Sequence, residues 1–265
     1  MIYDIQKASM MKRASAWLLD IILFMVVVTG CMYGWAYVFD PTPHIEELSG
    51  IMESYEQQFG GNLEMTDEEF AKLTAQEQEE ARQISQKINE ALNKDARALK
   101  LLEMIATYIF AMISLSILCA HFLLEFLIPL FLKNGQTLGK KCFGIALMRK
   151  DGVRVTPFMM FARTILGKST VETMLPAMLF VLAMLGAGGL VLYLSVGLLI
   201  AQVIVPVWTA NKTAIHDLIA CTVAVDMSSQ MIFDTPEEME AYKARVDEEY
   251  SQARTENGNE APVEE

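Results

Sequence analysis

Three stretches of this chain are almost free of charged side chains, and each is long enough to cross a bilayer. Positions 16–38 contain only Asp20 as a charge, positions 104–132 contain only Glu125, and positions 173–208 contain none. About 20 consecutive apolar residues span a bilayer core. Charged and apolar residues therefore occupy separate parts of the chain, as in membrane proteins.

The third stretch is too long for one ordinary span. Near its middle lies Gly186-Ala187-Gly188-Gly189, a sequence typical of a tight turn. We expect two shorter helices there, forming two full spans or a re-entrant hairpin, and we count four spans in all. The predicted fold class is an all-α membrane protein with four transmembrane helices, an extracytoplasmic helical hairpin insert and a small cytoplasmic β-hairpin.

Lysine and arginine indicate the orientation of these spans. Lys7, Lys12 and Arg13 precede the first span, and positions 133–172 carry eight basic and two acidic side chains. By the positive-inside rule, both regions face the cytoplasm. Positions 40–103 carry 15 acidic and 6 basic side chains, a net charge of −9, and are expected outside. Four spans then place both termini in the cytoplasm.

The N-terminus also has features of a secretory or lipoprotein signal, because basic residues and an apolar run precede Val28-Thr29-Gly30-Cys31. However, Asp20 interrupts the apolar run, and the chain stays apolar after Cys31. We therefore expect a retained span.

The outer insert is predicted to be helical. Two threonines, Thr66 and Thr74, are each followed three residues later by glutamate, the pattern of a capping box. No proline or glycine lies between Ala75 and Pro129, so one long helix is expected to run from the insert into the second span. Its expected partner is an apolar stripe formed by Ile45, Leu48, Met52, Tyr55 and Phe59. This hairpin is either a docking surface or a solvated helix pair.

The basic cytoplasmic segment mixes strand and helix patterns. Short β-compatible runs at 145–155 flank Asp151-Gly152, a dipeptide suited to a hairpin turn, and Thr222 to Val225 is compatible with a further strand. Phe158 to Gly167 follows Pro157 and is predicted to be a short interfacial helix. Its Arg163 is expected to reach lipid headgroups or buried carboxylates.

Several polar residues are predicted to meet inside the membrane. Arg13 and Asp20 are seven residues apart, nearly two helical turns, and so share one face of the first span. His121, Glu125 and Gln202 lie at a similar depth when counted from the cytoplasmic ends of their spans. We predict an intramembrane polar cluster of Asp20, His121, Glu125 and Gln202, with Arg13 or Arg163 as counter-charge. Such a cluster is either an ion or proton site or a network that fixes helix register.

His216-Asp217 is a second candidate pair. No nucleophile, HExxH spacing or cysteine cluster accompanies it, so we predict no enzymatic activity, no cofactor and no metal. We expect Thr213 or Asn211 to cap a short helix, and Asp217 to pair with Arg13 or Arg163.

Positions 135–141 superficially resemble a phosphate-binding loop. The spacing is wrong, and lysine stands where serine or threonine should follow. We expect a turn leading into a basic interfacial segment, whose lysines attract anionic lipid headgroups.

The C-terminal tail is strongly acidic. From Asp226 to the end there are 12 acidic and 3 basic side chains, which excludes nucleic acid as a partner. Pro236 to Tyr250 is predicted to be an exposed helix, and Ser251 to Glu265 has the composition of a disordered segment.

Together these motifs resemble the RDD family of bacterial multi-pass membrane proteins, named for an arginine and two aspartates. The resemblance rests on Arg13, Asp20, Asn134 to Lys141, Asp151-Gly152, Arg163 and His216 to Thr222. It implies that Arg13, Asp20 and Asp217 are the name-giving residues, and that the protein lies in the bacterial inner membrane. The family commonly has glycine where Cys221 stands. The resemblance implies no settled molecular function.

The predicted organisation has four parts. Residues 1–39 contain the N-terminus and first span, 40–103 the acidic insert, 104–226 the remaining spans with the basic loop, and 227–265 the tail. One functional hypothesis is transport of a small ion or solute through the charged layer. The other is a non-transporting module that scaffolds or regulates a partner membrane complex. Against transport stand the few spans and the lack of a visible inverted repeat, although a homo-oligomer would supply further walls.

Overall fold

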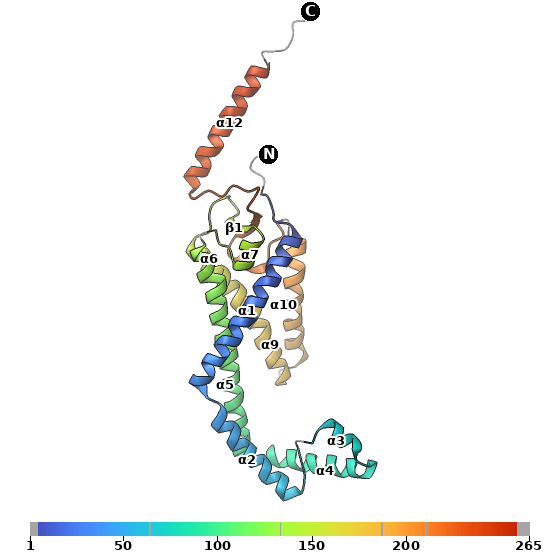
Figure 1. Cartoon of the computed structure of the whole chain (residues 1–265). Helices are drawn as coiled ribbons and strands as arrows, with labels where there is room; N and C mark the ends of the chain where they lie inside the picture. Colours follow the sequence, from blue (N-terminus) through green and yellow to red (C-terminus); the bar gives the residue numbers. More distant parts are fainter. Residues whose placement is uncertain (1–4, 64, 133, 187, 210, 259–265) are drawn as a thin grey trace, which may run out of the picture. The chain divides into compact units, whose positions relative to one another are not determined.

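Four helices in the computed structural model are long and apolar enough to cross a membrane, as predicted. They are Met10–Phe39, Ala96–Phe131, Pro157–Met184 and Gly189–Trp208 (Figure 1). The structure describes residues 5–258 except Glu64, Lys133, Ala187 and Ala210. The chain forms two compact units, one of Met1–Val28 with Ile117–Glu265 and one of Thr29–Ser116, which are described separately below.

Prolines shape the membrane-length helices. The first is α1 (Met10–Phe39), and the second joins α5 (Ala96–Ala120), the π-helical η1 (His121–Leu127) and α6 (Ile128–Phe131). A proline has no backbone N–H and leaves the carbonyl four residues earlier without its helical donor. Pro129 thereby frees the carbonyl of Glu125, which accepts a hydrogen bond from Thr164 Oγ1 at 2.9 Å. Proline thus creates a polar link between two membrane-length helices.

The third membrane-length helix begins earlier than the sequence suggested. It runs without a break through α8 (Pro157–Phe161), η2 (Ala162–Met174, π-helical) and α9 (Leu175–Met184). The predicted interfacial helix at Phe158 to Gly167 is therefore its first part. Its charged side chains do not end the helix, because Arg163, Lys168 and Glu172 find partners within the protein. The fourth helix, α10 (Gly189–Trp208), packs against α9.

A small antiparallel sheet lies at one end of these helices, here called the sheet end. It pairs β1 (Ile145–Arg149) with β2 (Thr222–Asp226), and a short helix precedes each strand: α7 (Leu138–Cys142) and α11 (Ile215–Ile219). The predicted hairpin around Asp151-Gly152 is confirmed only as a short turn, with one antiparallel bridge between Met148 and Arg154 and a hydrogen bond from the amide of Arg149 to the carbonyl of Val153 at 2.8 Å. The main partner of β1 is β2, which confirms the further strand predicted at Thr222 to Val225. Strand β2 has three consecutive apolar residues, whereas in the segment after Gly152 the charged Arg154 separates Val153 from Val155.

Both faces of the sheet are buried. One face packs Ile145, Leu147 and Ala224 against Ala16 of α1 and Met160 of α8. The other face gathers four buried residues, namely Ala146, Met148, Val223 and Val225. The sheet end is therefore a small hydrophobic core that holds the first and third membrane-length helices.

The second unit contains the insert: α2 (Thr42–Phe59), α3 (Asp67–Lys72) and α4 (Ala75–Leu92), with α2 against α4. Both predicted capping boxes, at Thr66 and Thr74, are confirmed. The predicted continuous helix from Ala75 is wrong. Asp95 accepts hydrogen bonds from the amides of Arg97 at 2.8 Å and Ala98 at 3.2 Å, so a new helix begins at Ala96.

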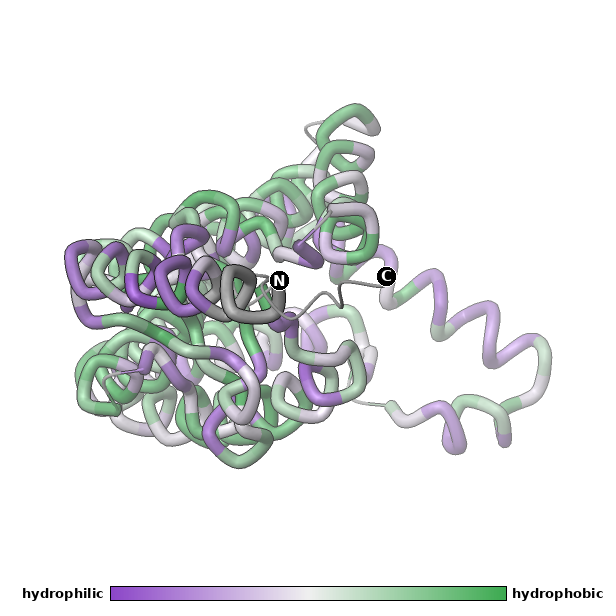
Figure 2. Tube along the Cα trace, turned by 90° about the horizontal axis from the view of Figure 1, so that it is seen from above, coloured by the Kyte–Doolittle hydropathy of each residue, from purple (hydrophilic) through white to green (hydrophobic). Residues whose placement is uncertain are grey.

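Hydropathy differs between the two kinds of helix. Hydrophobic residues predominate along the membrane-length helices, whereas α3 and α4 are rich in hydrophilic residues (Figure 2). The acidic tail forms α12 (Pro236–Gly258), which confirms the predicted helix and extends beyond Tyr250 into the segment expected to be disordered. The rest of that segment, 259–265, lies outside the described residues.

Candidate functional site

A cavity of about 280 Å³ lies among the membrane-length helices. The predicted cluster residues Asp20, His121, Glu125 and Gln202 all line it, whereas the predicted counter-charge Arg163 lines the cavity described next. The third helix adds Lys168, Glu172 and Thr173, and the remaining lining residues are Trp17, Ile21 and Phe24. We call this space the bundle cavity. It brings three carboxylates together with a lysine, a histidine and an amide inside the helical bundle.

A second cavity, also of about 280 Å³, adjoins the first and extends to the short helices of the sheet end. The two cavities share Trp17, Asp20, Lys168 and Glu172. Further charged residues line the second one: Arg13, Lys140, Arg163, Lys212 and Asp217. We call it the charged vestibule. The three residues assigned to the family motif by resemblance, Arg13, Asp20 and Asp217, all line it.

Asp20 binds the beginning of α7. Its Oδ2 accepts a hydrogen bond from Thr137 Oγ1 at 2.5 Å, and its Oδ1 accepts one from the amide of Gly139 at 2.8 Å. A carboxylate at this position satisfies free amides at a helix start. A Cβ atom at Gly139 would lie 2.3 Å from the carbonyl oxygen of Ala16, so the close approach of α7 to α1 requires glycine.

Glu125 is buried and incompletely satisfied. Its Oε1 accepts a hydrogen bond from Lys168 Nζ. Its Oε2 lies 3.7 Å from Nη1 of the buried Arg163, and neither of these two atoms has a hydrogen-bond partner. Burying a charged atom without a hydrogen bond costs free energy. The ion pair between Glu125 and Arg163 is therefore longer than the contact between Glu125 and Lys168 and lacks a hydrogen bond.

Arg163 and Asp217 form the central ion pair. Arg163 Nε donates to Asp217 Oδ1 at 2.8 Å, and Thr222 Oγ1 donates to the same oxygen at 3.0 Å. Burial alone would raise the pKa of Asp217, but the neighbouring charges of Arg163 and Lys140 hold it well below its ordinary value. Of the two arginines predicted to pair with Asp217, the structure selects Arg163.

Glu172 holds the beginning of α11. One of its oxygens accepts a hydrogen bond from the amide of His216 at 2.8 Å, and its carboxylate also contacts His216 Nδ1 at 2.7 Å. Because His216 Nε2 lies 2.9 Å from Arg163 Nη2, which can only donate, Nε2 must accept and Nδ1 carries the proton. Burial accordingly lowers the pKa of His216. Thr213 and Asn211 do not cap this helix, contrary to the prediction; its N-cap is Ala214.

The remaining predicted residues have other hydrogen-bond partners. Arg13 donates to the carbonyls of Lys212 and, at 2.6 Å, Ala224, so it anchors backbone and does not pair with Asp217. His121 Nδ1 lies 3.1 Å from its own helix carbonyl at Ile117 and binds neither Asp20 nor Glu125 in the described structure. Gln202 Nε2 donates at 2.7 Å to the carbonyl of Glu172, which Pro176 leaves without a helical donor.

Sequence reasoning missed Lys168, Glu172 and Lys140 as site residues. The spacing of Lys168 and Glu172, one helical turn apart and shortly after Arg163, could have indicated that both face the bundle. They were missed because a membrane-spanning helix was not expected to continue through three charged residues. Burial, together with the nearby charge of Arg163, lowers the pKa of Lys140 to about 8. Among the described residues, no group of three or more histidine, cysteine or acidic side chains is arranged to hold a metal ion.

A sequence model of the RDD family matches residues 7–221. The chain belongs to the RDD family. Membership, together with the four membrane-length helices, makes it a multi-pass membrane protein. The RDD match includes every residue that lines the bundle cavity. No curated protein and no solved structure matches the chain.

Proposed function

We propose that this RDD protein moves a small ion or solute across the membrane through the bundle cavity and the charged vestibule. The observation that carries the proposal is the bundle cavity itself, where Asp20, Glu125 and Glu172 gather among membrane-length helices. Charged groups within a membrane are costly and commonly mark ion or substrate pathways. We also propose that the protein has no enzymatic activity.

The long ion pair between Glu125 and Arg163, which lacks a hydrogen bond, supports a site over a purely structural network. A network that only fixed helix register would gain from complete pairing of its buried charges. Here Glu125 Oε2 and Arg163 Nη1 are both buried without hydrogen-bond partners. An ion, or a water that accompanies it, would supply the missing partner for one of these atoms.

The orientation follows from the distribution of charge. Basic residues concentrate near the sheet end, whereas positions 40–103 carry a net charge of −9. By the positive-inside rule, we propose that the sheet end and both termini face the cytoplasm of a bacterial cell, with the insert outside the inner membrane. Anionic headgroups would then surround the basic loop, and a homo-oligomer would supply further walls for the pathway.

Flux through the purified protein tests this proposal. The full chain is reconstituted into vesicles, and the decay of imposed proton, monovalent-cation and anion gradients is followed with ion-sensitive dyes. Transport predicts faster decay of at least one gradient than in protein-free vesicles. A correctly folded protein that dissipates none of these gradients would contradict ion transport, and a radiolabelled-solute uptake panel then tests the solute alternative.

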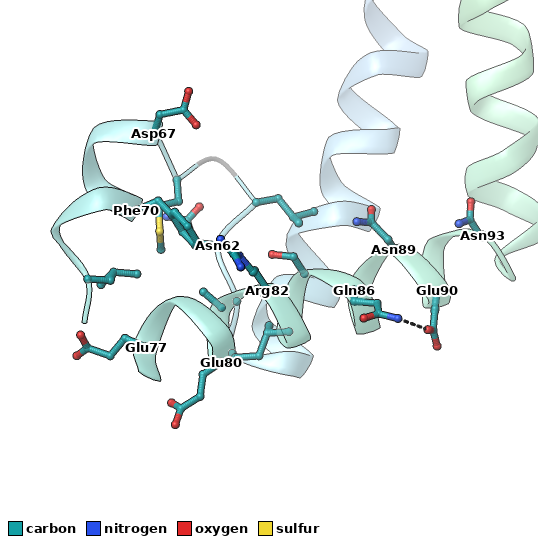
Figure 3. Close-up of a pocket in the computed structure, with 18 residues that line it drawn as sticks. Asn62, Asp67, Phe70, Glu77, Glu80, Arg82, Gln86, Asn89, Glu90 and Asn93 are labelled. Atoms are coloured by element: carbon teal, nitrogen blue, oxygen red, sulfur yellow. Dashed lines mark hydrogen bonds between the residues drawn. The ribbon is translucent and has the colours of Figure 1, made fainter. Parts of the chain in front are cut away.

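A second candidate function, the scaffolding or regulation of a partner membrane complex, is favoured by one feature of the insert. An open cavity of about 930 Å³ lies between the loop before α3 and the α4 helix (Figure 3). The guanidinium of Arg82 lies 5.4 Å from the ring centre of Phe70 in this cavity, and Asp67, Glu77 and Glu80 lie along its edges. Such a surface suits a basic segment of a partner. Capture of a defined membrane complex by the full chain, lost on charge reversal at Glu77 and Glu80, would support this function.

A further inference from the structure

The two short helix–strand segments of the sheet end have the same construction. Helices α7 and α11 are each five residues long, and so are strands β1 and β2. Two residues connect helix to strand in both cases, and the second of them, Gly144 or Cys221, has a positive φ. Equivalent positions in the two segments differ by 77 in sequence number, as in 221 − 144.

The backbone before each helix also repeats at this interval. Thr137 has φ −72° and ψ 171°, and Ala214, 77 positions later, has φ −74° and ψ 168°. Gly135 and Lys212 both have a positive φ, 61° and 50°. The same interval relates two pairs of identical residues, Asn134 with Asn211 and Pro129 with Pro206. The correspondence therefore extends from the membrane helix, through the connection, into the strand.

The register of the sheet reveals how the two segments are related. Leu147 pairs with Ala224, which is its own equivalent at the interval of 77. At the same interval, Ile145 is equivalent to Thr222, and Asp226 is equivalent to Arg149. Ile145 pairs with Asp226, and their equivalents Thr222 and Arg149 also pair with each other. A two-fold axis through the Leu147–Ala224 pair therefore exchanges β1 with β2 and leaves the pairing register unchanged.

Two carboxylates of the bundle cavity, Asp20 and Glu172, bind equivalent positions of the two segments. Asp20 accepts a hydrogen bond from the amide of Gly139, and Glu172 accepts one from the amide of His216, 77 positions later. Asp20 lies on α1 and Glu172 on η2, the first membrane-length helix of each half. On the second helix of each half, Glu125 and Gln202 are also 77 positions apart, and all four residues line the bundle cavity.

We infer that the first unit, without its acidic tail, consists of two related halves around a two-fold axis, with the bundle cavity at their interface and Asp20 and Glu172 as equivalent positioning residues. Each half contains two membrane-length helices, a short helix and a strand. Equivalent helices run in the same direction relative to the sheet, so the axis runs along the bundle. This is the parallel type of repeat, which a search for inverted repeats does not reveal.

In both halves, a cavity carboxylate is coupled to a short helix of the sheet end. Because each carboxylate both lines the bundle cavity and holds the beginning of a short helix, a change of occupancy or charge in the cavity reaches the sheet end through two equivalent hydrogen bonds. This coupling does not depend on transport and would serve a sensing module equally well.

The equivalence makes a specific prediction at Ala214. The hydroxyl of its counterpart Thr137 accepts a hydrogen bond from the amide of Lys140 and donates one to Asp20. A threonine at 214 would do the same toward the amide of Asp217 and the carboxylate of Glu172. Ala214→Thr is therefore expected to stabilise α11, and Ala214→Val, which has the same shape without the hydroxyl, is the matched control.

Amide hydrogen exchange of the full chain in detergent or lipid nanodiscs measures this effect. The expected result is exchange of the α11 amides slowed about fivefold in Ala214→Thr relative to Ala214→Val, the typical effect of a cap. Equal exchange in the two variants would overturn the equivalence. Neither substitution removes a native side-chain hydrogen bond or ion pair, and the two variants differ from each other only by the hydroxyl in place of a methyl group.

A second arm tests the carboxylates. Glu172→Gln is expected to accelerate exchange at α11, and Asp20→Asn at α7, each with little effect on the other helix. Uniform acceleration over both helices, or no change in either, would overturn the assignment. Exchange is measured without flux, so these outcomes remain distinguishable from a failure of the proposed transport.

Discussion

Arg163 donates a hydrogen bond to Asp217 across 2.8 Å, and both side chains are almost completely buried. This pair joins the third membrane-length helix to the short helix α11. Removing one partner of a buried ion pair leaves an uncompensated charge. We therefore predict that Asp217→Ala lowers the free energy of unfolding by about 3 kcal/mol or more.

Chemical denaturation in detergent, followed by tryptophan fluorescence, checks this value. The matched control is Asp151→Ala, which breaks the exposed Arg149–Asp151 pair and is expected to cost at most about 1 kcal/mol. Similar losses in the two variants would contradict the central position given to Asp217.

The positive φ of Cys221 predicts a stabilising substitution. A non-glycine residue pays roughly 1–2 kcal/mol in the left-handed region, and Cys221 has φ 54°. Cys221→Gly is expected to raise the free energy of unfolding by about 1 kcal/mol. The control Cys142→Gly, in the helical conformation of α7, should lower it by a similar amount. Stabilisation by both substitutions, or by neither, would show that backbone conformation is not the cause.

The contact between Gly139 and α1 predicts a large steric effect. A methyl group at 139 would meet the carbonyl of Ala16 and the carboxylate of Asp20, whereas one at Gly197 of α10 would meet no atom within 4 Å. Gly139→Ala is expected to displace α7 and lower the melting temperature, whereas Gly197→Ala should leave it unchanged or raise it. Thermal unfolding in detergent compares the two variants. A tolerated Gly139→Ala would contradict the close packing.

Lys140 predicts a dependence of stability on pH. Its pKa falls from 10.5 to about 8 in the folded protein, because of burial and the nearby charge of Arg163, partly offset by Glu125 and Asp217. Between pH 8 and 10.5 the unfolded chain therefore binds more protons at this lysine than the folded one, and the contribution of Lys140 to stability rises with pH. Unfolding midpoints across this window should show that rise, and Lys140→Met should abolish it. The neighbouring exposed Lys141 supplies the control, because Lys141→Met should retain the rise.

Much of the membrane architecture was predictable because it depends on local composition. Helix length, apolar content and the glycines near 186–189 identified the four membrane-length helices. Helical spacing and depth along each span also selected Asp20, His121, Glu125 and Gln202, which line one cavity. These inferences require only the geometry of single helices and a shared membrane level.

The pairings within the site were not predictable, because they depend on tertiary structure. Asp20 binds a backbone amide of α7 rather than a basic side chain, and β1 pairs with a strand 77 positions away rather than across its adjacent turn. The break between α4 and α5 at Asp95 was not predicted, for a different reason. An aspartate within a helical pattern is also an effective N-cap, and only its surroundings decide between these roles.

The most direct test of the account is flux by the Glu125→Gln variant in reconstituted vesicles. Glu125 lines the bundle cavity and makes no backbone cap with its carboxylate, so its charge can be removed without releasing α7 or α11. Exposed Glu103 of α5 provides the matched control. We predict flux by the native chain and by Glu103→Gln, and loss of most of it in a folded Glu125→Gln. Equal flux in all three proteins would contradict the assignment of the cavity as the pathway.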